Sequence, residues 1–233
     1  MSNAFPEQFL VIEAATAAGS VALVIDRQVV ADRDVVLGAS RDDALLPAIA
    51  EVLRDRGISP RDLKAIACGS GPGSFTSLRI AAALAKGFAV ANPISFFAIP
   101  SLLLAGATLR NDPGNYFVHS DALRGDRYVL EIKVNHDGQV TALSEMQRLS
   151  LVHLDEQFQL ANRPVSLVAV GASMVSAHDS RSVQPHARNV LALQSVWSKF
   201  GPVDVTSWEP DYGRAAEAQV KWEITHGQSL PAF

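Results

Sequence analysis

The sequence predicts a mixed α/β protein built from two lobes, and three observations lead to this fold class. The first 110 residues alternate between β-rich runs and helical patterns, a cluster of turn-forming residues interrupts the chain at 111–115, and a second series of β-rich runs follows. With 233 residues, of which 48% are apolar, the chain is long enough to bury a sizeable core. We therefore expect a first lobe over residues 1–110 and a second, smaller lobe over residues 116–233.

The first lobe is predicted to open with three strands. Short β-rich runs cover residues 9–13, 20–25 and 29–36, and small or polar residues join them, which indicates an antiparallel meander. A helix should follow, capped by Ser40 and ended by Gly57, with its apolar side chains on one face. A proline in this helix places the start of its regular part close to that proline.

The centre of the first lobe is predicted to be a strand, a glycine-punctuated loop and an alanine-rich helix. The strand covers residues 63–68, and the loop uses three glycines to turn sharply. Thr76 or Ser77 is expected to cap the orphan N–H groups of the helix, in which apolar residues recur at helical spacing. A strand over residues 94–99 and a helix over residues 101–110 complete the order βββαβαβα.

The second half repeats this opening. Residues 116–120, 127–134 and 140–144 are predicted strands, and a hairpin turn at 135–138 joins the last two. Further along, the patterns indicate a helix over 154–161, a strand over 165–170, a loop-like stretch over 174–188 and a helix over 189–200.

Charge and cysteine content narrow the function classes. The chain has a formal net charge of −4 and a pI near 5.8, whereas a protein that binds nucleic acid alone is usually basic. Any contact with nucleic acid should therefore be shared with a partner. The single cysteine, Cys68, falls in a predicted buried strand, which favours an inert thiol and a reducing, cytoplasmic setting. No stretch approaches the ~18 consecutive apolar residues of a membrane span, so no membrane contact is expected.

The glycine-punctuated loop leaves two interpretations open. A glycine loop that feeds a helix N-terminus can bind an anion, but no Lys-Ser/Thr pair closes this one, and Ser74 stands where a dinucleotide-binding loop has its third glycine. The alternative is a tight turn that lets a helix pack closely on a sheet. The loop also lacks a Gly-x-Ser-x-Gly nucleophile elbow, which argues against the usual hydrolase reading.

A longer string around this loop points to a known family. Gly71-Pro72-Gly73-Ser74-Phe75-Thr76, followed by Leu78-Arg79-Ile80 and Ala85-Lys86-Gly87, closely resembles the signature of the TsaB (YeaZ) family. Ser77 and Ala81 replace glycines that are usual in that family. The resemblance implies a non-catalytic partner in bacterial synthesis of threonylcarbamoyladenosine, a tRNA modification beside the anticodon. It also implies kinship with glycoprotease-like (M22) proteins and with the actin/Hsp70/sugar-kinase superfamily.

Two further segments are similar to the same family. Asp121-Ala122 with Gly125, Asp126 and Tyr128 resembles its Asp-Ala-Arg-x-Gly-Glu-x-Tyr hairpin, with Leu123 in place of Arg. Residues 209–214 are similar to its Pro-x-Tyr-x-Arg tail, with Gly213 where Leu is usual. The implied fold is two-lobed and actin-like (ribonuclease H-like), with a βββαβαβα first lobe and a degenerate second lobe.

In that superfamily a nucleotide lies between the lobes, and the resemblance assigns this cleft to Glu13, Thr16, Gly71, Gly73, Ser74 and Asp121. Glu13 keeps a carboxylate, but Ala14 offers no hydroxyl for Mg²⁺ or phosphate. We therefore expect a degenerate cleft, which lacks part of the nucleotide-binding residue set. Asp121 can equally be a turn residue that satisfies local N–H groups. We expect no cofactor and no catalytic residue; the alternative is an ATP-dependent transferase or M22-type glycoprotease of the same fold.

A metal site is not expected either. The catalytic paralogue in the resembled family holds its metal partly with a His-x-x-x-His pair on the first helix, where the present chain has no histidine. The six histidines are scattered through the second half without an i,i+4 pair, which favours solvated or singly hydrogen-bonded roles.

The alanine-rich helix remains as the candidate functional surface, because small side chains all round it permit close approach of another helix. The alternative is that every face is internal packing. The resemblance favours an interface, for which we expect Phe75, Leu78, Arg79, Ala82, Ala85, Lys86 and Ala89. The implied partners are a TsaD-like catalytic paralogue and a TsaE-like ATPase, with tRNA reached only through the complex and a homodimer formed when the partner is absent.

Overall fold

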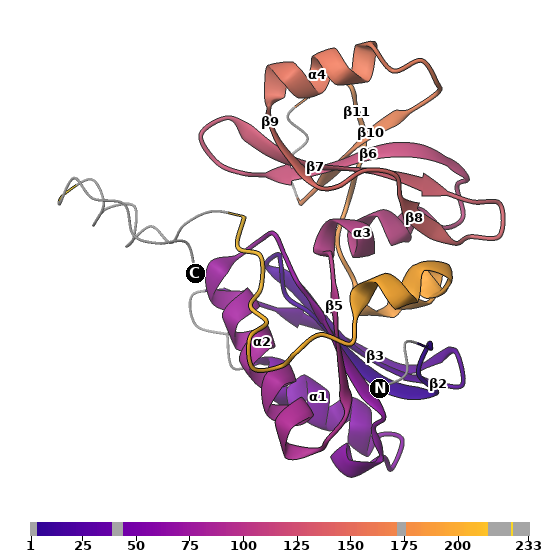
Figure 1. Ribbon diagram of the computed structural model, residues 1–233, viewed down its shortest axis with the longest axis vertical. Coiled ribbons are helices and arrows are strands. Elements are labelled where there is room, and N and C mark those ends of the chain that lie inside the picture. Colours follow the sequence, from indigo (N-terminus) through magenta and orange to yellow (C-terminus); the bar gives the residue numbers. More distant parts are fainter. Residues whose placement is uncertain (1–3, 39–43, 172–175, 214–224, 226–233) are drawn as a thin grey trace.

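The computed structural model describes residues 4–38, 44–171, 176–213 and 225, which form two β-sheets with helical segments between and outside them (Figure 1). The mixed α/β fold with two lobes is the one that the sequence predicts. Within the described ranges, no helix combines the length and the apolar character needed to cross a bilayer.

The first sheet has the strand order β3-β2-β1-β4-β5. Its strands are β1 (Gln8–Glu13), β2 (Ala18–Ile25), β3 (Gln28–Val36), β4 (Ala65–Gly69) and β5 (Ser95–Ile99). The first three pair antiparallel, which confirms the predicted meander, whereas β4 lies parallel to β1 and β5 parallel to β4. Parallel neighbours need crossover connections, and α2 (Phe75–Ala91) supplies the one between β4 and β5.

The second sheet has the order β11-β10-β6-β7-β8, with β9 also paired to β7. Its strands are β6 (Gly114–Asp121), β7 (Asp126–Val134), β8 (Val140–Ala142), β9 (Gln147–Ser150), β10 (Ser166–Val170) and β11 (Asp179–Val183). β6 and β7 form an antiparallel hairpin, while β10 runs parallel to both β6 and β11.

The helices form three layers around these sheets. α1 (Leu45–Arg54) and α2 cover one face of the first sheet, and α4 (Leu151–Gln159) covers the far face of the second (Figure 1). Between the sheets lie α3 (Ser101–Gly106), its 3-10 continuation η3 (Ala107–Leu109) and the 3-10 helix η4 (Ala187–Phe200). A short 3-10 turn, η2 (Pro60–Asp62), precedes β4.

Alternation along the strands divides the core. In β1, Leu10 and Ile12 join the cluster beneath α1 and α2, whereas Phe9 and Val11 face the layer between the sheets. Among the described residues, Trp197 of η4 is the largest fully buried side chain, and its ring lies 5.2 Å from the Phe9 ring between centroids. η4 comes from the second half of the chain but packs on the first sheet, so the two halves of the sequence do not correspond simply to the two sheets. The division into lobes at residues 111–115 remains a prediction.

Several local predictions need correction. The stretch predicted as loop-like contains β11, an edge strand whose sequence is almost entirely polar and in which only Val183 is buried, so no strand pattern marks it. β9 was also missed. Ser74 occupies the N-cap of α2, and the predicted caps lie in its first turn. Ala44 precedes α1 at the N-cap, and Ser40 lies outside the described residues.

Candidate partner surface and interlobe pocket

The glycine loop is fixed from below by the Glu13 carboxylate. Glu13 ends β1 and is fully buried; its Oε1 accepts a hydrogen bond from the Ala15 N–H (2.6 Å), and its Oε2 accepts one from the Ser101 hydroxyl (2.9 Å). The Ser101 oxygen in turn accepts from the N–H of Gly71 (3.1 Å). Burial raises the pKa of Glu13 to about 7, although these hydrogen bonds oppose the shift.

Two glycines that flank the loop are required because neighbouring atoms approach their Cα atoms closely. A Cβ on Gly69 would lie 2.0 Å from the Glu13 Oε2 atom, and one on Gly73 would lie 2.2 Å from the Ala15 carbonyl oxygen. Ser74 N–H also donates to that oxygen at 2.7 Å. The loop is therefore packed tightly against the β1–β2 turn, which supports the close-packing interpretation at these positions.

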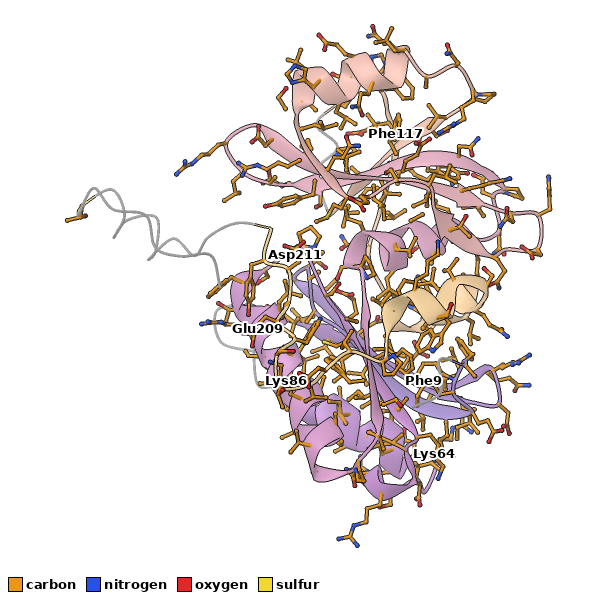
Figure 2. All side chains as sticks on the ribbon, viewed as in Figure 1. Phe9, Lys64, Lys86, Phe117, Glu209 and Asp211 are labelled. Atoms are coloured by element: carbon orange, nitrogen blue, oxygen red, sulfur yellow. The ribbon has the colours of Figure 1, made fainter. Side chains whose placement is uncertain are left out.

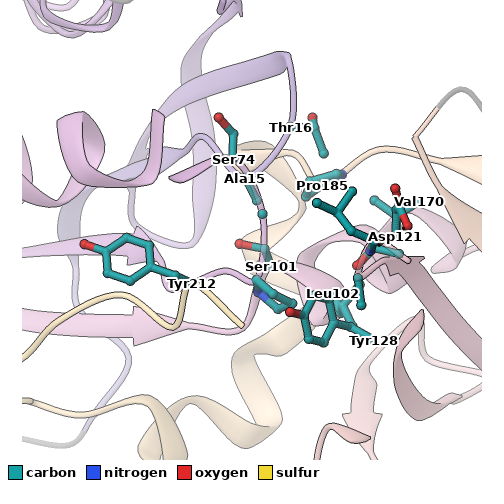
Figure 3. A pocket seen from close by; sticks show the side chains of 15 residues that line it. Ala15, Thr16, Ser74, Ser101, Leu102, Asp121, Tyr128, Val170, Pro185 and Tyr212 are labelled. Atoms are coloured by element: carbon teal, nitrogen blue, oxygen red, sulfur yellow. Dashed lines mark hydrogen bonds between the residues drawn. The ribbon is translucent and has the colours of Figure 1, made fainter. Parts of the chain in front are cut away.

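A pocket of about 280 Å³ lies above the loop, between the two lobes (Figure 3). Four of the six predicted cleft residues line it: Thr16, Gly73, Ser74 and Asp121. The other two do not: Glu13 is buried behind the wall, and Gly71 is buried against the backbone of Asp211. The described lining contains no lysine or arginine that could neutralise a phosphate.

Asp121 acts as a turn residue. Its Oδ1 atom accepts a hydrogen bond from the Leu123 N–H at 2.9 Å, as in an Asx turn. The turn also carries Leu123 and Arg124 at φ values of +63° and +57°, in the left-handed region that such side chains disfavour. The interpretation of Asp121 as a turn residue thus accounts for its hydrogen bond in the hairpin.

A buried polar network in the second lobe was not predicted. His119 is fully buried; its Nε2 atom lies 2.6 Å from Asp179 Oδ1, and Arg127 Nε donates to its Nδ1 atom at 3.0 Å. This places the imidazole proton on Nε2, and burial lowers the pKa of His119. In the described part of the chain, no group of three or more His, Cys, Asp or Glu side chains could hold a metal ion. His226 lies outside it.

The structure divides the predicted interface residues of α2 into two sets. Leu78, Ala82, Ala85 and Ala89 are buried within the chain, where the alanines let the helix lie close to the first sheet. The small side chains on this face are thus explained by internal packing. Phe75, Arg79 and Lys86 remain partly or fully exposed.

These three residues contact a segment that sequence reasoning did not place. Residues 203–212, here called the tail, run beside α2 (Figure 2). Lys86 Nζ lies 2.7 Å from Glu209 Oε1, and the Phe75 ring lies 4.6 Å from the Tyr212 ring between centroids. Asp211 N–H donates to the Ser70 carbonyl at 2.7 Å. The available signal was the alternation of the apolar residues Val203 and Val205 with polar ones, followed by the aromatic residues Trp208 and Tyr212.

The opposite face of α2 is open. Thr76, Arg79, Ala83, Gly87 and Val90 are all exposed, and their spacing of three and four residues aligns them in one line along the helix. We call this line the α2 seam. A Cβ added to Gly87 would meet no atom within 4 Å. The surface that α2 presents to solvent is thus this seam.

Comparison with known proteins gives consistent results. Residues 39–158, just over half of the chain, match the family model "TsaD: tRNA N6-adenosine threonylcarbamoyltransferase". The tRNA threonylcarbamoyladenosine biosynthesis protein TsaB of Bacillus subtilis (strain 168) is 27% identical over 212 residues, which cover 87% of this chain and 92% of that protein. TsaB of Escherichia coli (strain K12) is 32% identical over 133 residues, 56% of this chain and 57% of that protein.

Solved structures agree on the fold. YeaZ from Pseudomonas aeruginosa superposes with a TM-score of 0.71 at 20% identity, over 88% of this chain and 99% of that one. A P. aeruginosa protein described as similar to peptidase YEAZ gives 0.73 at 21% identity, over 89% and 100%. These identities support the two-lobed actin-like architecture and not an activity.

Proposed function

The chain belongs to the TsaB (YeaZ) family, and we propose that it serves tRNA threonylcarbamoyladenosine synthesis as a non-catalytic subunit that binds and organises a TsaD-like catalytic paralogue. The observation that carries this proposal is that an exposed helix surface occurs together with a pocket whose described lining offers no evident catalytic group. α2 offers the exposed seam, with small residues at its centre. Such a surface suits a protein partner.

The interlobe pocket supports the absence of catalysis by this chain. The carboxylate nearest to the loop, Glu13, is buried and hydrogen-bonded to Ala15 and Ser101, so it faces no substrate. Among the described residues of the pocket wall, no histidine or lysine lies beside the hydroxyls of Thr16 and Ser74 to act as a base. Burial raises the pKa of the Cys68 thiol, which disfavours a nucleophilic thiolate.

Family membership supports a proposal for the remaining partners. We propose that a TsaE-like ATPase joins the complex, that tRNA is reached only through it, and that the chain pairs with itself when the paralogue is absent. The acidic charge of −4 fits this division of labour, because RNA binding by this chain alone would need a basic surface. The cytoplasmic setting stays a prediction.

Assembly is the direct test of this proposal. Sedimentation velocity of the purified chain mixed with the TsaD-like paralogue of its own host should show a complex that neither protein forms alone. Free, non-interacting species at micromolar concentrations would contradict the proposal. Calorimetry with ATP and Mg²⁺ distinguishes this proposal from the alternative hypothesis of an enzyme. We expect no binding of ATP by the isolated chain. A micromolar dissociation constant would favour an ATP-dependent transferase.

A further inference from the structure

We infer that the second lobe holds a binding pocket for a free α-amino acid whose side chain is polar and uncharged. The pocket has a volume of about 380 Å³, which is in the range of small-molecule sites. Val129 lines it, whereas the preceding residue of β7, Tyr128, lines the interlobe pocket. Because successive side chains of a strand point to opposite faces, the two pockets lie on opposite faces of the second sheet. The inference is independent of the proposed function.

An irregularity at the edge of β7 creates the pocket. β8 and β9 both pair with this edge, but the residues between them, 143–146, leave the regular ladder. These four residues stand opposite only two residues of β7, Leu130 and Glu131. The Ser144 hydroxyl takes the place of a strand carbonyl and accepts a hydrogen bond from the Glu131 N–H at 3.2 Å. The pocket therefore lies where the edge of the sheet bulges.

The floor of the pocket is apolar. Phe117 of β6, which lies beneath α4 (Figure 2), and Val129 of β7 are both buried in the cluster that α4 covers. Glu131 is on the same face as Val129, two residues along the strand, and only 15% of its side chain is exposed. A carboxylate is thus held beside an apolar surface, where its attraction for a positive group is stronger than in open water.

One carboxylate and one guanidinium are the charged groups of the described lining. Arg163, in the loop after α4, forms an ion pair with Glu131, and 51% of its side chain is exposed. A ligand with only a negative charge would be repelled by Glu131, and one with only a positive charge would be repelled by Arg163.

A zwitterion satisfies both charges. Its ammonium group can bind the Glu131 carboxylate while its own carboxylate binds the Arg163 guanidinium, which suits bidentate contact with a carboxylate. Arg163 has a long side chain on an exposed loop, so it can withdraw from Glu131 and admit the ligand without a change in the sheet. A free α-amino acid is the small zwitterion that places these two groups on one carbon.

The remaining polar groups of the described lining select the side chain of the ligand. Gln147, Gln157 and Asn162 contribute amides, and Ser144 contributes a hydroxyl. These groups donate and accept hydrogen bonds but carry no charge. A charged side chain would therefore lack a counter-ion in the pocket, whereas a hydroxyl or amide side chain would find partners. The candidate ligands are free serine, threonine, asparagine and glutamine.

Calorimetry of the purified chain with each of these four amino acids tests the inference. At least one of them should bind saturably. Its N-acetyl derivative lacks the ammonium charge and its α-amide lacks the carboxylate, so each derivative should bind about tenfold more weakly or worse. Saturable binding by none of the four, or equal binding of the derivatives, would overturn the inference.

Two substitutions test the location of the site. Glu131→Gln keeps the size of the side chain but removes the charge that meets the ammonium group, and Arg163→Met removes the guanidinium. Each should weaken binding about tenfold or more. Both variants should fold, as a thermal melt can check, because a partly exposed ion pair contributes little to stability.

Matched controls come from the same lobe. Glu156→Gln neutralises an exposed carboxylate of α4, and Arg148→Met removes an ion pair with Asp126; neither changed residue lines the pocket. Both controls should keep wild-type affinity. Wild-type affinity in the folded Glu131→Gln and Arg163→Met variants, or equal losses in the controls, would overturn the assignment of the site.

Discussion

At the residue scale, the most informative group is Glu13. Sequence comparison with nucleotide-binding relatives suggests a metal or phosphate role for a carboxylate at the end of β1, but the structure uses it to hold a loop. Its two oxygens accept from Ala15 and Ser101, and Gly69 lacks a Cβ because the carboxylate occupies that space. A spacing pattern in the sequence shows that a carboxylate is present; only the packing shows which groups it faces.

The buried carboxyl of Glu13 predicts a pH-dependent stability. Its folded pKa, about 7, lies above the unfolded value of 4.5, so its contribution is fully present below pH 4.5 and is lost as the pH rises through 7. Ionisation in the folded protein then costs about 3 kcal/mol. We expect the unfolding free energy of wild type, relative to Glu13→Gln, to fall by this order between pH 4.5 and 8.

Urea denaturation at several pH values measures this difference. The subtraction matters because burial lowers the pKa values of His119 and His186, and these two groups change stability in the opposite direction over the same pH range. Parallel pH profiles for wild type and the Glu13→Gln variant would show that the carboxyl titrates normally in the folded protein.

At the element scale, α2 and the tail illustrate what sequence reasoning reaches. The helix and its glycine loop were predicted because local pattern determines both. The sequence did not separate the face of α2 that is buried within the chain from the face that is exposed, since an alanine-rich helix has little amphipathic contrast to mark its buried side. The tail was noted only as a resemblance. Its docking depends on contacts with residues more than a hundred positions away, such as Lys86 with Glu209, which no local pattern encodes.

Trp208 is predicted to anchor the tail. Its ring lies 4.8 Å from the Phe96 ring in a T-shaped contact, and it packs against the cluster beneath α1 and α2. Because the side chain is only partly buried, Trp208→Ala should lower the unfolding free energy by roughly 2 kcal/mol, less than for a fully buried tryptophan.

Chemical denaturation checks this value, with Trp208→Phe as the control that keeps an aromatic ring against Phe96. The control should retain most of the stability. A loss below ~0.5 kcal/mol in the alanine variant, the range of ordinary surface substitutions, would mean that the tail does not depend on this anchor.

At the scale of the whole molecule, the two lobes share one central layer. The sequence predicted two sheets because the β-rich runs repeat on both sides of residues 111–115, and the second sheet confirms that repeat. It did not predict that η4 would return to the first sheet, because its apolar residues indicate a buried helix without indicating which sheet it covers. The pocket between the lobes is likewise a product of tertiary packing, lined by the loop, the hairpin and the tail.

The central claim, that this chain acts by organising a catalytic partner, is tested most directly by reconstitution. The measurement is threonylcarbamoyladenosine formed on tRNA, by mass spectrometry of digested nucleosides, with purified paralogue, ATPase, ATP and an activated threonylcarbamoyl donor. We predict product only when this chain is added together with the paralogue, and none from this chain alone. Product from the chain without the paralogue, or unchanged product when the chain is left out, would contradict the account.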